Sequence, residues 1–155
     1  MKVQLKSFTI IGRNGREHTF TGRRLGFSTS RTEVHTHPVS AHPPYRYAPR
    51  GEKCSACRWF EVYLYERASV VSTEDTIQRT DYDYVVHTVG GSAVPGEQRF
   101  SRVEFTHSPF EVIELLTVRR NGAEPYIMAQ SSRALAQAAE LDDGIREAYV
   151  NRAVV

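Results

Sequence analysis

The chain has 155 residues, of which 40% are hydrophobic and 25% charged, and its net charge is +2. This composition excludes a disordered chain and fits one folded domain, which we place over residues 1–155. No apolar run approaches the roughly 20 residues that cross a bilayer, and the first residues alternate polar and apolar, unlike a signal peptide. We therefore expect a cytoplasmic protein without a membrane partner.

The first part of the chain predicts a β-hairpin. Residues 3–11 alternate as a strand whose phase changes near Ser7, where we expect a bulge. Asn14-Gly15 tolerates positive φ at both central positions of a type I′ turn. A second strand is expected over residues 17–29, with apolar positions at Phe20, Leu25 and Phe27.

The middle of the chain predicts further strands. Residues 58–67 place apolar or aromatic side chains on both faces, as in a central strand, with Phe60, Val62 and Leu64 facing one way and Trp59, Tyr63 and Tyr65 the other. Strands are also expected around residues 82–86 and 98–106. The composition of residues 90–96 predicts a mobile connection between them. The tyrosines of the paired strands are expected to form one cluster, made of Tyr63, Tyr65, Tyr82 and Tyr84.

The C-terminal part predicts helices. Ser108-Pro109-Phe110-Glu111 combines an N-cap serine, a proline at N1 and a glutamate at N3, which begins a helix to about Val118. The alternative is a strand over 112–118 that Asn121-Gly122 joins to a strand over 126–129. A last helix, capped by Ser131 or Ser132, carries apolar residues three or four apart, and Gly144 weakens or breaks it.

The order of these elements predicts an α+β fold. We expect a mainly antiparallel sheet of about five strands in the N-terminal two-thirds and one or two helices at the C-terminus. The remaining feature is a long Pro-rich loop over residues 30–57, for which a bound metal would be an organiser.

Candidate metal ligands crowd into this loop. Both cysteines of the chain, Cys54 and Cys57, have the C-x-x-C spacing that lets two sulfurs face one ion. His35 and His37 point to the same side of an extended segment. His42 is an alternative to either histidine. We therefore expect one zinc ion, structural rather than catalytic, held by two histidines and two cysteines.

Two other interpretations of the cysteine pair carry different chemistry. A Cys2His site would leave a position for water, as in a zinc-dependent hydrolase or deaminase. The deaminase signature H-x-E…P-C-x-x-C is broken here, because His37 replaces the glutamate and Lys53 replaces the proline. Thioredoxin-like redox chemistry expects a helix after the motif, whereas a strand is predicted.

The charges are unevenly distributed along the chain. Residues 1–60 carry 11 basic and 3 acidic residues, a net charge of +8, and residues 61–155 carry 9 and 15, a net charge of −6. The basic half favours an acidic partner such as nucleic acid, although the two halves also complement each other within one domain. Arginines and aromatic residues alternate here, as in proteins that grip phosphates and stack bases. The predicted nucleic-acid contacts are Arg16, Arg23, Arg24, Arg46, Arg50, Tyr45, Tyr47 and Trp59.

Three functions remain open from the sequence. The first is a zinc-stabilised binding protein that contacts nucleic acid through its basic N-terminal half. The second is a zinc-dependent hydrolase or deaminase-like enzyme with an open metal position. The third is a protein–protein adaptor of a phage or mobile element. No Walker loop, G-x-S-x-G or H-E-x-x-H motif points to another enzyme class.

Overall fold

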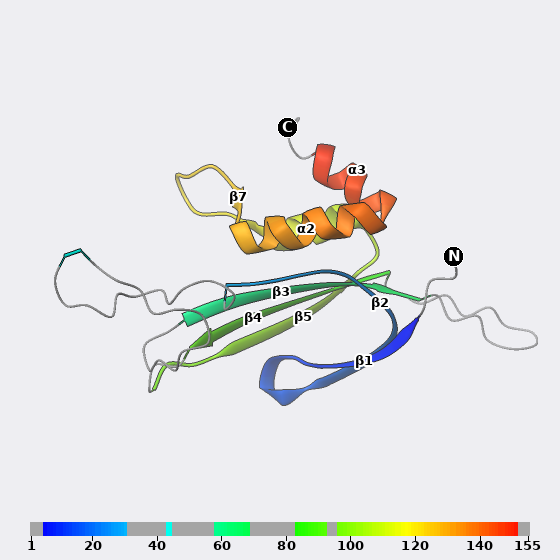
Figure 1. Ribbon diagram of the computed structural model, residues 1–155, viewed down its shortest axis with the longest axis horizontal. Helices are drawn as coiled ribbons and strands as arrows, with labels where there is room; N and C mark the ends of the chain where they lie inside the picture. Colours follow the sequence, from blue (N-terminus) through cyan, green and yellow to red (C-terminus); the bar gives the residue numbers. More distant parts are fainter. Residues whose placement is uncertain (1–4, 31–42, 45–57, 69–82, 93–95, 152–155) are drawn as a thin grey trace, which may run out of the picture.

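The computed structural model describes residues 5–30, 43–44, 58–68, 83–92 and 96–151, and shows a curled sheet with helices on one face (Figure 1). Five antiparallel strands follow one another in chain order: β1 (Lys6–Ile11), β2 (Glu17–Thr29), β3 (Arg58–Arg67), β4 (Tyr84–Ser92) and β5 (Phe100–Thr106). After them come α1 (Pro109–Leu116), β6 (Thr117–Val118), β7 (Tyr126–Ile127), α2 (Ala129–Leu141) and α3 (Asp143–Asn151). The α+β order and the antiparallel sheet are confirmed, but three C-terminal helices are present instead of one or two.

The turn between β1 and β2 is built on Asn14 and Gly15. Their φ angles are 59° and 74°, so both residues are left-handed, as the Asn-Gly pair predicts. The Arg16 N–H donates to the Arg13 carbonyl at 3.2 Å, and the Gly12 N–H donates to the Arg16 carbonyl at 2.7 Å. The turn therefore presents two arginines, Arg13 and Arg16, at the tip of the hairpin.

The irregularity that bends the sheet lies in β2. The β1–β2 pairing is regular from Lys6 to Ile11, so the bulge expected near Ser7 is wrong. A register shift instead occurs between Arg24 and Gly26, within the part of β2 that pairs with β3. Bulges bend a strand and increase its twist. The long strand β2 thereby belongs to two differently oriented parts of the sheet, and its hairpin with β1 curls beneath β3–β5 (Figure 1).

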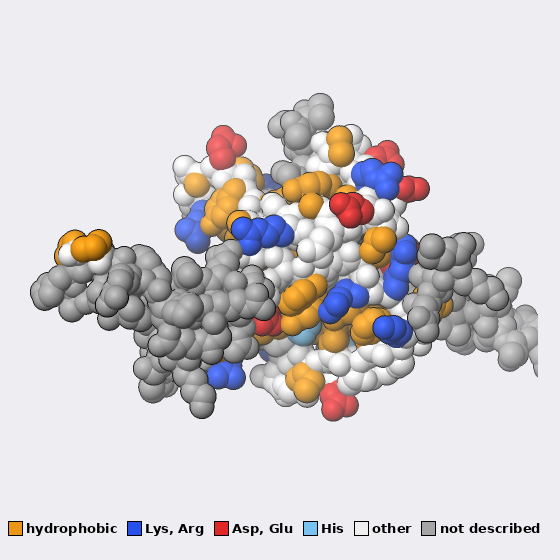
Figure 2. Space-filling model, viewed as in Figure 1, with side chains coloured by type: hydrophobic (Ala, Val, Ile, Leu, Met, Phe, Trp, Pro, Cys, Tyr) orange, Lys and Arg blue, Asp and Glu red, His pale blue; other side chains and the backbone are white. Residues whose placement is uncertain are grey.

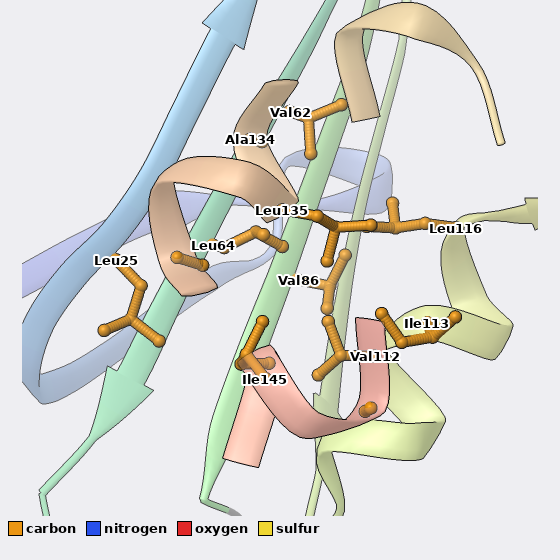
Figure 3. Packing of buried hydrophobic residues seen from close by; sticks show 12 residues of the cluster. Leu25, Val62, Leu64, Val86, Val112, Ile113, Leu116, Ala134, Leu135 and Ile145 are labelled. Atoms are coloured by element: carbon orange, nitrogen blue, oxygen red, sulfur yellow. The ribbon is translucent and has the colours of Figure 1, made fainter. Parts of the chain in front are cut away.

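One core lies between the sheet and the helices. Leu135 of α2 lies among side chains from β3, β4 and α1, including Leu64, Val86 and Leu116 (Figure 3). Its side chain is 0% exposed. Gly26 brings β2 against the backbone of α2, because a Cβ there would lie 2.2 Å from the Ala134 carbonyl oxygen. The helical layer is therefore packed closely onto the sheet.

A second core fills the inside of the curl. It contains Ile10, Phe20, Tyr65 and Val85, with aromatic rings from β1, β3 and β5 packed around them. The Phe8 ring lies 5.5 Å from Phe20 and 4.9 Å from Tyr65. The Ser101 hydroxyl of β5 donates to the Ile11 carbonyl of β1 at 2.7 Å. The first and last strands of the sheet therefore meet at this point.

The prediction of a mobile connection at Gly90 and Gly91 is wrong, because both residues lie in β4. A Cβ at position 91 would lie 1.9 Å from Cε2 of Trp59, and one at position 90 would lie 1.9 Å from Cε1 of Phe100. The two glycines are present because aromatic rings from β3 and β5 lie directly against the β4 backbone. They are packing residues rather than turn residues.

The tyrosines do not form a single cluster. Tyr63 and Tyr65 face the inside of the curl with ring centres 6.5 Å apart. Tyr84 instead packs against the core beneath the helices, and its hydroxyl donates to Asp142 at 3.1 Å. Tyr82 lies outside the described residues.

The helical region combines both sequence alternatives. Ser108 caps α1 by accepting from the Phe110 N–H at 3.1 Å, as predicted, and α1 ends at Leu116. The next two residues form β6, which pairs with β7 in a short antiparallel ladder. The helix α2 begins at Ala129, before the predicted serine caps. Asp142 separates α2 from α3 and accepts from the Ile145 N–H at 2.8 Å, so the break precedes Gly144.

Candidate functional site

The predicted zinc ligands fall outside the part of the chain that the structure describes. These residues are His35, His37, His42, Cys54 and Cys57. Among the described residues, no group of three or more His, Cys, Asp and Glu side chains is arranged to hold a metal ion. In the same part of the chain, no helix has both the length and the apolar character needed to span a bilayer.

Half of the predicted nucleic-acid contacts are described. Arg16 is exposed at the hairpin tip, Arg23 and Arg24 lie in β2, and Trp59 lies at the start of β3. The other predicted contacts, Tyr45, Arg46, Tyr47 and Arg50, lie outside the described residues. The candidate interface is therefore built here from the described residues near Arg16 and Trp59.

A hollow of about 1030 Å³ lies between the β1–β2 turn and the beginning of β5. One wall is the hairpin tip, which supplies Arg13 and Arg16, and the other runs along residues 98–104, which supply Arg99 and Arg102. We call this hollow the arginine groove, after its four arginines. It exists because β1 curls back to β5, where Ser101 bonds Ile11. The groove therefore draws half of its arginines from the acidic half of the chain.

The charge of the arginine groove is positive. Among its lining residues, the single acidic side chain is Glu104, whose Oε1 lies 2.7 Å from Nε of Arg102. Both partners are well exposed, so this pair is weak and competes poorly with a polyanion. Within the described part of the chain, Arg13 and Arg16 form no ion pair. The groove thus offers guanidinium groups from two walls, a geometry that suits phosphate oxygens.

Aromatic side chains accompany these arginines. The Arg99 guanidinium lies over the Trp59 ring, 5.6 Å from its centre, and its Nε donates to the Ser92 carbonyl at 3.2 Å. Phe100 lines the groove and remains 54% exposed. The contacts predicted from the sequence omit Arg13 at the hairpin tip, and they omit Arg99, Phe100 and Arg102. The signal for the last three was the run Arg-Phe-Ser-Arg in the predicted strand over residues 98–106.

Two of the predicted arginines are placed elsewhere. The Nε of Arg23 lies 2.6 Å from Oε2 of Glu66, and a second nitrogen donates to the Leu141 carbonyl at 2.9 Å. Arg23 therefore links β2 to β3 and to α2. Arg24 lies over the Phe27 ring at 5.4 Å and does not line the groove. In the view of Figure 2, arginine and lysine side chains lie on both the sheet and the helical layer, and acidic side chains also lie on both.

His87 of β4 lies inside the curl and is 9% exposed. Its Nε2 lies 2.8 Å from the Ser101 hydroxyl, which gives its own proton to the Ile11 carbonyl. The serine must therefore accept, so Nε2 carries the imidazole proton. Among the described residues, nothing hydrogen-bonds Nδ1. Burial lowers the pKa of His87, and the charge of Glu61 opposes that shift. We conclude that His87 is a neutral residue that supports one wall of the groove.

The aromatic partner of His87 is Tyr63, whose ring stacks on the imidazole at 5.3 Å. The Tyr63 hydroxyl donates to Oε2 of Glu61 at 2.8 Å. Burial, together with this hydrogen bond, raises the pKa of Tyr63 to about 12. The phenol therefore stays protonated and orients the Glu61 carboxylate at neutral pH.

The fold and the groove define a small α+β domain with a curled antiparallel sheet and one helical layer. Its cationic hollow lies between the β1–β2 turn and the beginning of β5. Comparison of the chain with protein-family models, with curated proteins and with solved structures found no match.

Proposed function

We propose that this protein binds nucleic acid and that the phosphates lie in the arginine groove. The observation that carries the proposal is the placement of Arg13 and Arg16 opposite Arg99 and Arg102 around one hollow. Neutralising phosphates with arginine releases condensed counterions, which supplies most of the affinity of such proteins at low salt.

A polymer fits this site better than a small anion. In a site for one small anion, buried donors point towards a single position. The arginines of this groove are instead exposed and distributed over two walls. The hollow of about 1030 Å³ lies at the upper end of ordinary ligand pockets and is open to solvent. Aromatic rings beside the cations add a surface for bases. The groove therefore matches a chain of phosphates more closely than a single one.

The proposal includes a structural zinc ion. Its ligands would be Cys54, Cys57 and two of His35, His37 and His42, on the spacing of these residues in the sequence. Cys57 directly precedes β3, and Trp59 lies under Arg99 near the start of that strand. A metal bound there would anchor the chain beside the groove. Four protein ligands would close the site, and an open position would instead favour the enzyme alternative.

The experiment is a salt series of fluorescence anisotropy titrations with labelled oligonucleotides. Affinity should fall steeply with salt, and the double variant Arg16→Ala/Arg102→Ala should flatten the slope of log K against log salt. Each lost phosphate contact removes about 0.7 from the slope on a single strand and about 0.9 on a duplex.

The matched control removes the same charge from the helical layer. Arg119 and Arg146 are exposed and paired with Glu114 at 3.0 Å and Asp143 at 3.1 Å. The Arg119→Ala/Arg146→Ala variant should keep the slope of the unmodified protein. Absence of binding at low salt, or an equal loss in both double variants, would refute the proposal.

A further inference from the structure

Phe100 is an exposed aromatic residue with a fixed backing. It begins β5, between two arginines of the groove, and is 54% exposed. One side of the ring lies so close to Gly90 that a Cβ there would be 1.9 Å from Cε1 of the ring. Phe60 lies 6.4 Å from it, centre to centre. The ring is thus supported from behind and exposed at the rim of the groove.

We infer that the groove takes single-stranded nucleic acid and that Phe100 is the surface on which an unpaired base stacks. This inference rests on the proposed function, because the arginines must first hold the backbone. In a duplex each base is already stacked and paired, so an exposed ring beside phosphate contacts gains little from it. A single strand offers the π-face of each base, and stacking on an aromatic side chain is tolerant of sequence.

The neighbours of Phe100 match this arrangement. Arg99 and Arg102 flank it in sequence, and both line the same hollow as the ring. A strand whose phosphates contact these arginines would therefore pass along the hollow that Phe100 also lines. Because a supported ring needs no ordering when a base arrives, little side-chain entropy is lost on binding. The absence of a side chain at position 90 is what allows this backing.

The test compares three labelled probes of about 15 nucleotides, a length within the range covered by single-strand binding domains. They are oligo-dU, oligo-U and a mixed-sequence DNA duplex, each titrated with the intact protein at low salt. We expect both single strands to bind at least about 10-fold more tightly than the duplex. The two single strands show which sugar is preferred.

Variants then assign the preference to the ring. Phe100→Ala should weaken single-strand binding by about 5- to 150-fold, the range measured for loss of one stacked base, and leave the salt slope unchanged. Gly90→Ala should push the ring out of place and weaken binding while the ring is still present. Phe110→Ala is the control, because Phe110 is 55% exposed but lies on α1. It should bind as the unmodified protein does.

The outcomes separate this inference from the proposed function. Equal affinity for single strands and duplex, with no effect of Phe100→Ala, would overturn the inference and leave the phosphate groove standing. An equal loss in Phe100→Ala and Phe110→Ala would also overturn it. Absence of binding to every probe would overturn both. Thermal unfolding of each variant is the control that separates a loss of affinity from a loss of folded protein.

Discussion

The Nε2 atom of His87 lies 2.8 Å from the Oγ of Ser101, and this contact joins the middle of β4 to the strand that meets β1. The same serine hydroxyl donates a hydrogen bond to the Ile11 carbonyl. Two consecutive hydrogen bonds thereby connect the three strands β4, β5 and β1. These hydrogen bonds hold β5 against β1, where the arginine groove is formed. The protonation state of His87 therefore affects the stability of the groove wall at residues 98–104.

We expect the fold to lose stability in mild acid through His87. Burial places the folded-state pKa below the unfolded value of about 6.5, and of the neighbouring charges Glu61 opposes this shift while His18 adds to it. The unfolded chain therefore takes up the proton first. The stability is present above about pH 6.5 and is lost as the pH falls towards the folded-state pKa.

The measurement is urea unfolding at pH 7.5 and pH 5.5. The unmodified protein should lose more free energy of unfolding between the two pH values than His87→Gln, which does not titrate. His107→Gln removes an exposed histidine and should keep the full loss. The same loss in both variants would show that His87 does not cause it.

Arg23 and Arg16 should have opposite phenotypes. Arg23→Ala removes the contact with Glu66 at 2.6 Å and the bond to the Leu141 carbonyl at 2.9 Å, so we expect a loss of about 1 kcal/mol in stability. Its nucleic-acid affinity should stay within about twofold. Arg16→Ala should leave the melting temperature unchanged and weaken binding. If Arg23→Ala weakens binding as much as Arg16→Ala does, Arg23 contacts the ligand as the sequence predicted.

The helical layer should depend strongly on Leu135. This side chain is 0% exposed between the sheet and α1, so Leu135→Ala leaves a cavity and should cost about 2–5 kcal/mol. Leu141 lies on the same helix but is 52% exposed, and Leu141→Ala should cost less than about 1 kcal/mol. Chemical denaturation of both variants measures the difference. Similar costs would mean that α2 is not packed on the sheet in this register.

Elements that depend on local chemistry were predictable from the sequence. The Asn14-Gly15 turn is confirmed, and β2 and β3 match the residues expected, since alternation and turn residues act within a few positions. The groove was only half predictable. Arg99 and Arg102 reach the hairpin because the bulge in β2 and the contact between Ser101 and Ile11 curl the sheet. Those are relationships between distant parts of the chain.

Glycine shows the same limit of local reasoning. A Gly-Gly pair is typical of a loop, and nothing near Gly90 and Gly91 in the sequence reveals that rings from β3 and β5 occupy the space of their missing side chains. Their meaning is clear only when Trp59 and Phe100 are known to be their neighbours. Aromatic residues in flanking strands are therefore the feature to inspect before a glycine pair is assigned to a loop.

The zinc prediction is tested by metal content and by stability. The protein purified without chelator should carry one zinc per chain, and Cys54→Ser and Cys57→Ser should each lose most of it, because a thiolate ligand is removed. His107→Gln, which changes a histidine outside the predicted ligand set, should keep the metal. Chelation should lower the melting temperature of the unmodified protein and leave that of Cys54→Ser unchanged. Metal content near zero in the unmodified protein would end the zinc proposal, while the arginine groove would still be open to its own test.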